Sequence, residues 1–436
     1  MRWPWLLLLL ATLPGCGGTP DPRTQITLQR FFGACDAQYG RSTDVAKAEG
    51  ECGIITTLVN KFEADNPDIA VKTNIVFWPG YDQLTAQLAA NDEPDLVTMH
   101  VSVLPDFQAR GLLTPIGGEL VAAGIDPARF TPAAARAVTL GGRIYGLPFD
   151  NWAPLWHINM NEFRRAGLVR NGKPILPRNG PELLRQAEQF KRATGKPYLV
   201  QISANEYATY ARNLYTFLMQ QDARFFADPK RIRLRTPEAK AYLSLFKEIR
   251  DRGLTTRNQD YSAATASFLN GGGGVLLTGN WMVGAFDLES KSKGKPLSNG
   301  YAVAPYPQLF GASPARYVDG HVWVMPTNPR RTPAQRAAVL RLMRFLADHE
   351  ADWARTGHLP TFTDVIASPR FTTLPHRANY AALTRVGAPL PAGVRRQYPI
   401  ETIIGEESAA AINGNKTIDR ALADAERRIN DLLDNI

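Results

Sequence analysis

The stretch from Gly146 to Leu168, Gly-Leu-Pro-Phe-Asp-Asn-Trp-Ala-Pro-Leu-Trp-His-Ile-Asn-Met-Asn-Glu-Phe-Arg-Arg-Ala-Gly-Leu, decides the fold. The pattern of the chain changes at residue 143, just before this stretch, and the part from Ile144 to Asp150 is typical of an extended crossing segment. Upstream, segments with the periods of strands and helices alternate. Because such alternation is typical of open α/β sheets, we expect an α/β protein with ligands at the ends of its strands.

Periodicity predicts the individual elements on both sides of this stretch. Upstream we expect strands and helices in turn over residues 26–31, 54–62, 69–78, 81–88 and 95–100. Downstream we expect a mostly helical region, three short apolar strands and two terminal helices, over residues 181–252, 275–277, 301–305, 322–325, 332–346 and 417–433. The last helix carries apolar residues at steps of three and four, which is the pattern of a helix that packs on a core.

Composition and charge exclude several classes of protein. The chain has 436 residues, of which 44% are hydrophobic, so it can bury a core for two or three domains, or for one large domain. Its one long apolar run, Trp3 to Leu13, is too short to span a bilayer, which excludes a polytopic membrane protein. The formal net charge is +9, but the basic residues are scattered in small clusters, so we expect no nucleic-acid partner.

The first residues predict export. Met1-Arg2, the apolar run and Leu13-Pro-Gly-Cys16 form a signal peptide over residues 1–15, and the cleavage region resembles a bacterial lipobox. Residues 16–23 then form a lipidated tether that begins at Cys16. We therefore expect a membrane-anchored lipoprotein on the periplasmic face of the cell envelope. The other interpretation is a cleaved signal peptide followed by an incidental cysteine.

Two further cysteines, Cys35 and Cys52, remain in the chain. An even pair in an exported protein predicts one disulfide, and two buried free thiols are the alternative. Their spacing fits no zinc motif.

No sequence motif for catalysis is present. The chain lacks the metalloprotease, nucleophile-elbow, Walker A and dinucleotide-binding patterns. The run Gly271–Gly274 has no following Lys-Ser/Thr and is interpreted as a tight turn, and none of the six histidines has metal-ligand spacing with another. We therefore expect no metal, no cofactor and no enzymatic activity, although a glycosidase-like pair of carboxylates stays open.

Several segments resemble one family. The stretch 146–168 resembles the crossover segment of extracellular solute-binding proteins of sugar ABC transporters, with His157-Ile158-Asn159 in place of an aromatic step. In the order of the chain, further matches to family segments are residues 94–100, 267–271, 276–281, 319–326 and 358–362. Together with the lipobox, the resemblance spans nearly the whole chain, although the Thr-Trp that precedes the family helix at 177–190 is absent.

The resemblance implies a periplasmic-binding-protein fold with two α/β lobes joined by a hinge. Lobe one is residues 24–143 plus 303–355, and lobe two is residues 144–302 plus 356–436. A solute is held in the cleft between the lobes, and a hinge motion closes them around it. The implied partners are a small-molecule carbohydrate and the permease subunits of an ABC importer, and we expect a monomer.

A sugar offers apolar faces to aromatic rings and hydroxyl groups to polar side chains. The resemblance places Trp281 at the family's sugar-stacking position, with packing in the core as the alternative. The other candidates lie beside predicted strand ends, at the hinge or at a helix start. They are Asp150, Trp152, His100, His321, Asp319, Trp78, Asn205 and Glu206. Each has an alternative role, which is packing, capping a turn or forming an ordinary helix start. Trp156, Trp323 and Trp353 lie in apolar patterns and are expected in the core.

The resemblance thus implies a lipid-anchored receptor that binds a mono- to oligosaccharide and delivers it to a permease. A binder of a glycerophosphodiester or sugar phosphate is the nearest rival, and an Arg or Lys at the cleft, such as Arg316, would favour it. Two more distant functions also stay open, namely a periplasmic carbohydrate-active enzyme and a sensor subunit that passes its ligand to a signalling partner.

Overall fold

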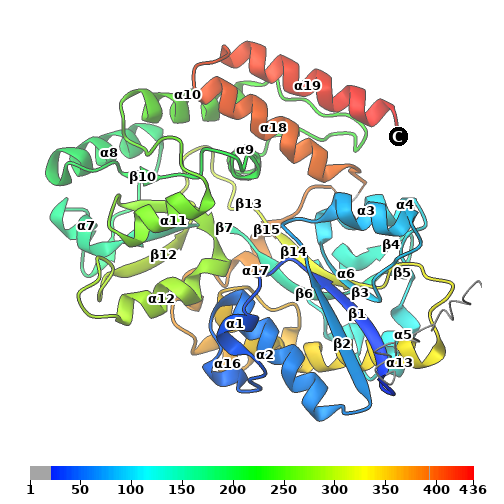
Figure 1. Ribbon diagram of the computed structural model, residues 1–436. Coiled ribbons are helices and arrows are strands. Elements are labelled where there is room, and N and C mark those ends of the chain that lie inside the picture. Colours follow the sequence, from blue (N-terminus) through cyan, green and yellow to red (C-terminus); the bar gives the residue numbers. More distant parts are fainter. Residues whose placement is uncertain (1–20, 392) are drawn as a thin grey trace, which may run out of the picture.

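The structure is a computed structural model that describes residues 21–391 and 393–436. The predicted signal peptide and Cys16 lie outside the described residues, as does most of the predicted tether. Among the helices that the structure describes, none is long and apolar enough to cross a membrane. The described chain folds into two α/β lobes, one built from blue, cyan and yellow segments and one mainly from green segments, with red helices beside the latter (Figure 1).

Lobe one is built on a five-stranded sheet in the order β2-β1-β3-β14-β6. The strands are β1 (Thr24–Arg30), β2 (Ile69–Ile75), β3 (Leu96–His100), β6 (Gly146–Trp152) and β14 (Asp319–Val324). β1 is parallel to both neighbours, whereas β14 is antiparallel to β3 and β6. The accompanying helices are α1 (Asp36–Tyr39), α2 (Gly50–Asp65), α3 (Tyr81–Ala89), α4 (Leu104–Ala109), α5 (Gly117–Ala122), α6 (Pro132–Val138), α13 (Pro333–Asp348) and α14 (Glu350–Trp353).

Lobe two is built on a four-stranded sheet in the order β10-β11-β7-β12. The strands are β7 (Pro154–Asn159), β10 (Leu199–Val200), β11 (Val275–Gly279) and β12 (Tyr301–Pro305). Its helices include α7 (Met160–Arg165), α8 (Gly180–Thr194), α9 (Ala208–Met219), α10 (Pro237–Asp251), α11 (Tyr261–Leu269) and α12 (Val283–Lys291). Short helices α15 (Thr363–Ala367), α16 (Pro369–Thr372) and α17 (Leu383–Val386) follow later in the chain, and the remaining short strands form two-residue pairs: β4 (Thr139–Leu140), β5 (Arg143–Ile144), β8 (Val169–Arg170), β9 (Lys173–Pro174), β13 (Arg316–Tyr317) and β15 (Gly387–Ala388).

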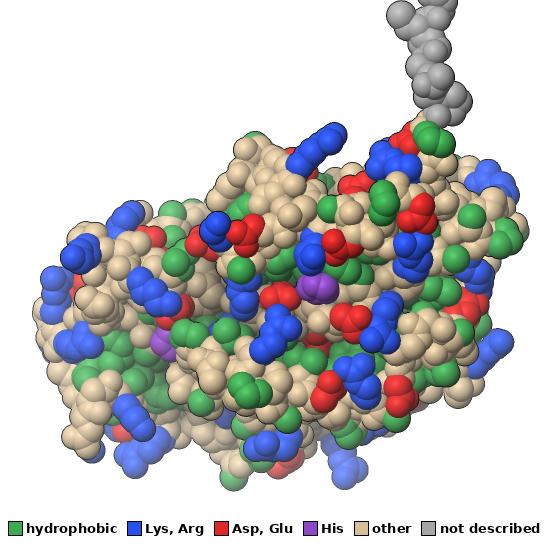
Figure 2. Space-filling model, turned by 90° about the horizontal axis from the view of Figure 1, so that it is seen from below, with side chains coloured by type: hydrophobic (Ala, Val, Ile, Leu, Met, Phe, Trp, Pro, Cys, Tyr) green, Lys and Arg blue, Asp and Glu red, His purple; other side chains and the backbone are tan. Residues whose placement is uncertain are grey.

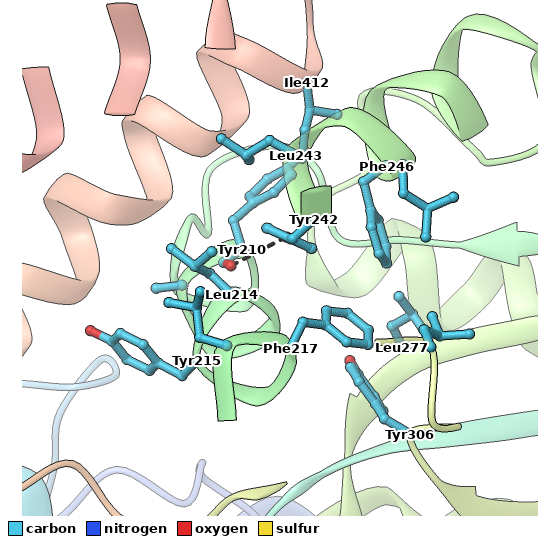
Figure 3. Packing of buried hydrophobic residues seen from close by; sticks show 14 of the residues in the cluster. Tyr210, Leu214, Tyr215, Phe217, Tyr242, Leu243, Phe246, Leu277, Tyr306 and Ile412 are labelled. Carbon is cyan, nitrogen blue, oxygen red and sulfur yellow. Dashed lines mark hydrogen bonds between the residues drawn. The ribbon is translucent and has the colours of Figure 1, made fainter. Parts of the chain in front are cut away.

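Aromatic rings fill the core of lobe two. Phe217 of α9 packs 5.5 Å from Tyr242 and 5.7 Å from Tyr306, measured between ring centroids (Figure 3). Tyr306 donates its hydroxyl hydrogen to Asn213 Oδ1 at 2.7 Å, which satisfies the buried phenol. Trp156, Trp323 and Trp353 are fully buried.

The two C-terminal helices, α18 (Gln397–Ile412) and α19 (Ile418–Asp434), pack on α9 and α10. The apolar side of α19 is buried, as its periodicity predicts. Since α18 also contacts the end of β3 in lobe one, through the turn Val101–Val103, it lies beside both lobes.

The chain crosses between the lobes at places that differ from the predicted boundaries. The strand β6 lies in residues that the sequence places in lobe two, but it pairs with β14 in the sheet of lobe one. Residues 303–305 are predicted in lobe one, but they belong to β12 and pair with β7 in lobe two. The segment 354–362 contributes Ala354 to a core of lobe two and Phe362 to the core of lobe one. These boundaries depend on which strands pair over long distances in the sequence. Local periodicity does not show such pairing.

Candidate functional site

A cavity of about 750 Å³ lies between the two lobes. It opens at the carboxyl ends of β1, β2 and β3, which is where open α/β sheets bind their ligands. Its walls come from lobe one, lobe two and α18, and they include Phe31, Glu51, Phe77, Trp78, His100, Trp152, Asn205, Glu206, Tyr207, Arg212, Tyr261, Trp281, His321, Tyr398 and Glu401. Aromatic rings and polar side chains therefore share the walls of one cavity.

Trp281 is held rigidly in the wall of lobe two. It follows β11, and its Nε1 donates a hydrogen bond to the Tyr261 hydroxyl at 2.8 Å. Its ring meets Trp152 edge to face, with centroids 5.6 Å apart and planes at 81°. Gly279 at the end of β11 makes room for the indole, because a Cβ at that position would overlap the Trp281 ring. These contacts together set the orientation of the indole in the wall.

The opposing wall in lobe one carries Phe77 and Trp78, directly after β2. Trp78 meets His100 edge to face at 5.9 Å between centroids. Phe77 is 93% exposed, although it lines the cavity. Aromatic faces therefore stand on both sides of the cleft.

His100 ends β3 as a neutral group. Its backbone N–H donates to the Tyr81 hydroxyl at 2.8 Å, and that hydroxyl in turn donates to His100 Nδ1. Burial, together with the nearby His321 and Arg212, holds the pKa of His100 well below its usual value. Phe31 stacks on the imidazole with ring planes 5° apart and centroids 5.2 Å apart. The pair presents one flat surface to the cavity.

Arg212 of α9 is a cavity residue that the sequence analysis does not identify. Its guanidinium carbon lies 4.4 Å from the ring centroid of Trp152 and 5.5 Å from that of Trp78. An ion pair of 3.6 Å joins its Nη2 to Glu401 Oε2, while its buried Nε has no hydrogen-bond partner among the described residues. Arg212 thus places a fixed cation with a free donor in the wall.

Arg316 has a different role from the expected one and does not line the cavity. Its guanidinium donates to the carbonyl oxygens of Tyr306, Ser313 and Ala315 and to the side chain of Gln308. These bonds hold the loop between β12 and β13 together.

Two acidic side chains, Glu401 and Glu206, line the same cavity as Arg212. Burial raises the pKa of Glu401, although Arg212 opposes the shift. Burial also raises the pKa of Glu206, and Arg212 again opposes the shift. Both carboxyl groups can therefore offer a proton or a lone pair to a hydroxyl group of an occupant.

Seven of the nine predicted ligand-binding residues line the cavity: Trp281, Trp152, His100, His321, Trp78, Asn205 and Glu206. Asp150 and Asp319 do not line it. The carboxylate of Asp319 accepts hydrogen bonds from the backbone N–H and the hydroxyl of Ser102, at 3.1 and 2.6 Å. Asp150 lies beneath the wall, where it accepts from His321 Nδ1 at 2.9 Å and Trp353 Nε1 at 2.7 Å. Internal partners occupy the oxygens of both carboxylates.

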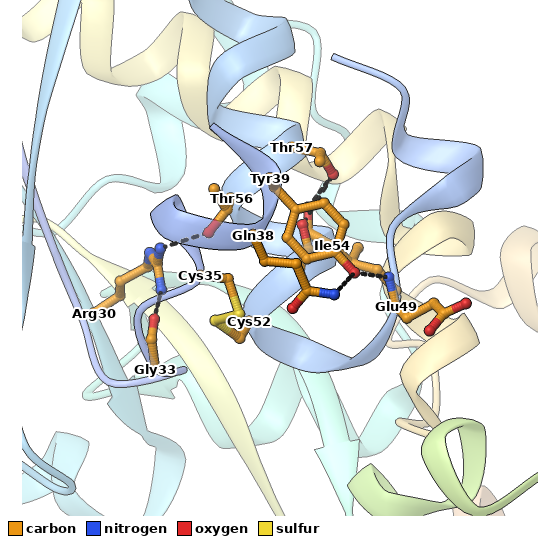
Figure 4. The surroundings of a disulfide bond; sticks show 11 residues. Arg30, Gly33, Cys35, Gln38, Tyr39, Glu49, Cys52, Ile54, Thr56 and Thr57 are labelled. Carbon is orange, nitrogen blue, oxygen red and sulfur yellow. Dashed lines mark hydrogen bonds between the residues drawn. A yellow bond between two sulfur atoms is a disulfide. The ribbon is translucent and has the colours of Figure 1, made fainter. Parts of the chain in front are cut away.

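A disulfide joins Cys35 to Cys52 and ties the segment after β1 to the start of α2 (Figure 4). Arg30 supports this segment by donating from Nη1 to the Gly33 carbonyl at 2.6 Å and from Nη2 to Thr56 Oγ1 at 3.0 Å. Because Phe31 and Glu51 belong to the cavity wall, the disulfide fixes two pieces of that wall relative to each other.

Charged side chains are mixed over the outer surface. On the face in Figure 2, Lys and Arg side chains lie among Asp and Glu and do not gather in one basic patch. This distribution is the ordinary solvated surface of a globular protein.

Comparison with known proteins gives relatives over nearly the whole chain. The sn-glycerol-3-phosphate-binding periplasmic protein UgpB of Salmonella typhimurium is 24% identical over 412 residues, which cover 88% of this chain and 90% of that protein. An Escherichia coli UgpB is 23% identical over 414 residues, with the same coverage.

Solved structures share the fold. Maltose-bound MalE3 of T. maritima matches with a TM-score of 0.76 at 19% identity, covering 94% of this chain and 100% of that chain. An ABC transporter solute-binding protein of Thermotoga lettingae, bound with α-D-tagatose, matches with a TM-score of 0.76 at 20% identity and the same coverage. The two-lobed α/β fold predicted from the sequence is thereby confirmed.

The family model described as bacterial extracellular solute-binding protein matches residues 53–353, which is well over half of the chain. Two lobes around a lined cavity are the arrangement that such a protein needs in order to hold a solute. The protein belongs to the bacterial extracellular solute-binding protein family, a family of transport receptors that do not convert what they bind.

Proposed function

We propose that this protein is a lipid-anchored receptor that binds a carbohydrate in the inter-lobe cavity and delivers it to the permease of an ABC importer. The observation that carries the proposal is the cavity of about 750 Å³ with Trp281 on one side and Trp78 on the other. Rings of this kind pack against the C–H faces of a sugar, and Asn205, Glu206 and Glu401 are placed to bond its hydroxyl groups. The similar folds that bind maltose and α-D-tagatose support the same ligand class.

Delivery to a permease follows from the position of the ligand between lobes. An occupant that contacts Trp78 and Trp281 together binds best when the lobes are closest, so it shifts the population towards the closed form. Permease subunits that recognise this closed form then distinguish the loaded receptor from the empty one. We propose that the receptor acts as a monomer.

The ligand test begins with protein purified without denaturation. Small molecules released from it are identified by mass spectrometry, and the affinity of the identified saccharide is then measured by calorimetry. A bound mono- to oligosaccharide that is recovered unchanged after prolonged incubation supports the proposal. Release of cleaved products, or binding of no saccharide in a broad screen, contradicts it.

A phosphorylated ligand is the second candidate, and Arg212 is the observation that favours it. A guanidinium group in a partly dry wall binds phosphate oxygens through charge-assisted hydrogen bonds, and the Nε of Arg212 has a free hydrogen for this purpose. The UgpB relatives carry sn-glycerol-3-phosphate binding in their name. In this variant of the proposal the ligand is a glycerophosphodiester or a sugar phosphate.

Arg212→Gln separates the two ligand classes. If the ligand is anionic, the variant loses at least tenfold in affinity for sn-glycerol-3-phosphate or a sugar phosphate, whereas binding of neutral sugars stays absent or weak. If the ligand is neutral, wild-type protein binds the neutral sugar and ignores its phosphate ester. Arg257→Gln, at an exposed position outside the cavity, is the matched control that removes one positive charge.

The anchor and the transport role need their own measurements. Mass spectrometry of the mature N-terminus from the native host should find an acylated Cys16, and an unmodified residue at or after position 17 contradicts the anchor. Uptake of the labelled ligand by cells that lack the gene should fall if the protein serves import. Normal uptake together with a lost transcriptional response would favour the sensor role instead.

A further inference from the structure

Three side chains that could ligate a metal meet at the floor of the cavity, which His321 lines. Asp150 lies in β6, His321 in β14 and His358 in the segment 354–362. One ligand atom from each lies within 4.8 Å of the others. The side chains are almost completely buried, with exposed fractions of 1%, 6% and 0%. In the sequence these residues are far apart, so their spacing gives no motif.

The hydrogen bonds around His358 decide which of its nitrogens carries the proton. The hydroxyl of Thr356 donates its one hydrogen to the Trp353 carbonyl at 2.7 Å. Its oxygen is 2.8 Å from His358 Nδ1, so it can only accept a hydrogen there. Nδ1 therefore carries the N–H, and in the neutral imidazole Nε2 has a bare lone pair.

The lone pair of His358 faces electron-rich atoms. Nε2 is buried and has no hydrogen-bond partner among the described residues. Its nearest acidic neighbours are Asp150 Oδ2 at 3.7 Å and Glu51 Oε1 at 3.5 Å. A buried acceptor that is directed at carboxylate oxygens is unfavourable unless an electron-poor atom lies between them.

A divalent transition metal supplies such an atom. Zinc takes imidazole nitrogen and carboxylate oxygen at about 2.0–2.1 Å, which places ligand atoms about 3.3 Å apart in a tetrahedron. The distances from Asp150 oxygens to His321 Nδ1, 2.9 Å, and to His358 Nε2, 3.7 Å, lie on either side of this value. Thr356 orients His358 and Trp353 Nε1 orients Asp150, as outer-shell partners do in metal sites.

We propose that Asp150, His321 and His358 form a binding site for a zinc-like divalent cation, with the negative charge of Glu51 beside His358 on the cavity side. The ligand atoms are Asp150 Oδ2, His321 Nδ1 and His358 Nε2. His321 takes the tautomer with its proton on Nε2 when the metal is bound, because Nδ1 then gives its lone pair to the metal. Two nitrogens and one carboxylate oxygen supply three positions of a tetrahedral shell, and a water molecule would complete it.

The position of the site gives it a structural consequence. Asp150 precedes the crossing from β6 to β7, His321 follows the return from lobe two, and His358 lies in the third connection between the lobes. A metal ion there would tie all three connections together. It therefore stabilises the hinge region, whatever solute the cavity holds.

The test uses untagged full-length mature protein. After removal of metals with a chelator and buffer exchange, Zn²⁺ is titrated by calorimetry, and the bound metal is counted by elemental mass spectrometry. We expect one equivalent per chain with a dissociation constant below 1 μM, on the order of 8 kcal/mol of binding free energy. The melting temperature should rise with Zn²⁺ as mass action requires, and Co²⁺ should give the visible bands of a tetrahedral site.

His358→Gln should lose at least a hundredfold in Zn²⁺ affinity and all of the thermal shift. His376→Gln is the matched control, because His376 also pairs with a carboxylate, Asp287, but lies outside the cluster. Glu51→Gln, at a partly exposed position, should weaken binding about tenfold and keeps the test valid if His358→Gln fails to fold. Binding of less than one equivalent by wild type, or unchanged binding by the His358 and Glu51 variants, would overturn the proposal.

Discussion

The indole nitrogen of Trp281 donates a hydrogen bond to the hydroxyl of Tyr261 at 2.8 Å, and this bond sets the plane of the ring that faces the cavity. Trp281→Ala removes the stacking surface, so we expect ligand affinity to fall more than tenfold, or about 1.4 kcal/mol or more. Tyr261→Phe keeps the ring but frees its orientation, so its loss should be smaller. Calorimetry with the identified ligand measures both, with Tyr145→Phe, outside the cavity, as the control. Unchanged affinity for Trp281→Ala would remove this residue from the site.

Gly279 should be as important for binding as the ring that it accommodates. In Gly279→Ala the new methyl group overlaps the Trp281 ring, so the indole has to leave its position. We expect weaker ligand binding with a change in the near-ultraviolet circular dichroism of tryptophan. Gly118→Ala is the matched control, because its Cβ would meet nothing within 4 Å and its backbone is not left-handed. Equal ligand affinity of the Gly279 and Gly118 variants would show that binding does not depend on the position of the Trp281 ring.

The disulfide between Cys35 and Cys52 should contribute to both stability and binding. It closes a loop with a sequence separation of 17 residues, and loop-closure entropy gives about 3 kcal/mol for such a link. Replacing both cysteines by serine should lower the free energy of unfolding by about that amount in urea denaturation. Ligand affinity should fall as well, since Phe31 and Glu51 flank the link. A reductant should destabilise the wild type and leave the double variant unchanged.

Glu350 should make the protein less stable as the pH rises. Burial raises the pKa of its carboxyl group from 4.5 to about 8, although Thr361 and Phe362 donate hydrogen bonds to it. The folded form therefore holds this proton more tightly than the unfolded chain does. The resulting stabilisation is complete below pH 4.5 and is lost as the pH rises to about 8, by up to about 1.4 kcal/mol per pH unit from this group.

Urea denaturation of Glu350→Gln between pH 5 and pH 8 isolates this effect, because glutamine does not titrate. We expect a smaller decrease of unfolding free energy with pH in the variant than in the wild type. Parallel curves for the two proteins would show that the carboxyl group titrates normally.

Much of the fold could be predicted from the sequence because its elements have clear periods. The strands β1, β2 and β3 and the helices α2 and α19 all occur where alternation or a stripe of apolar residues indicates them. The sequence did not show which strands pair with one another. His321 lies opposite Asp150 across 171 positions of the chain, and no local pattern reports such a contact. The lobe boundaries depend on that pairing and were therefore displaced.

The site was predictable where an aromatic or polar residue follows a strand. Trp78 and Trp281 follow a strand and His100 ends one, and all three line the cavity. Arg212 and Glu401 lie within helices, where one polar residue on a mostly buried face has the same pattern as a surface position. Their role depends on how α9 and α18 pack against the cleft.

Asp150 and Asp319 were predicted as ligand-binding residues, but neither lines the cavity. Asp150 follows the expected hinge segment, but it lies beneath the cavity wall, where its oxygens accept hydrogen bonds from Trp353 and His321. Its partner Trp353 lies 203 positions away in the sequence. The sequence therefore shows the carboxylate but not the groups that hydrogen-bond to it.

The exposed ring of Phe77 at the cleft has a consequence for the empty receptor. Water around an apolar ring costs roughly 25 cal/mol for each square ångström that could be covered, which is a few kcal/mol for a whole phenylalanine side chain. This unfavourable hydration persists as long as the ring is exposed. It ends only when a bound solute or the other lobe covers the ring. Removing water from this single side chain therefore contributes part of the free energy of solute binding.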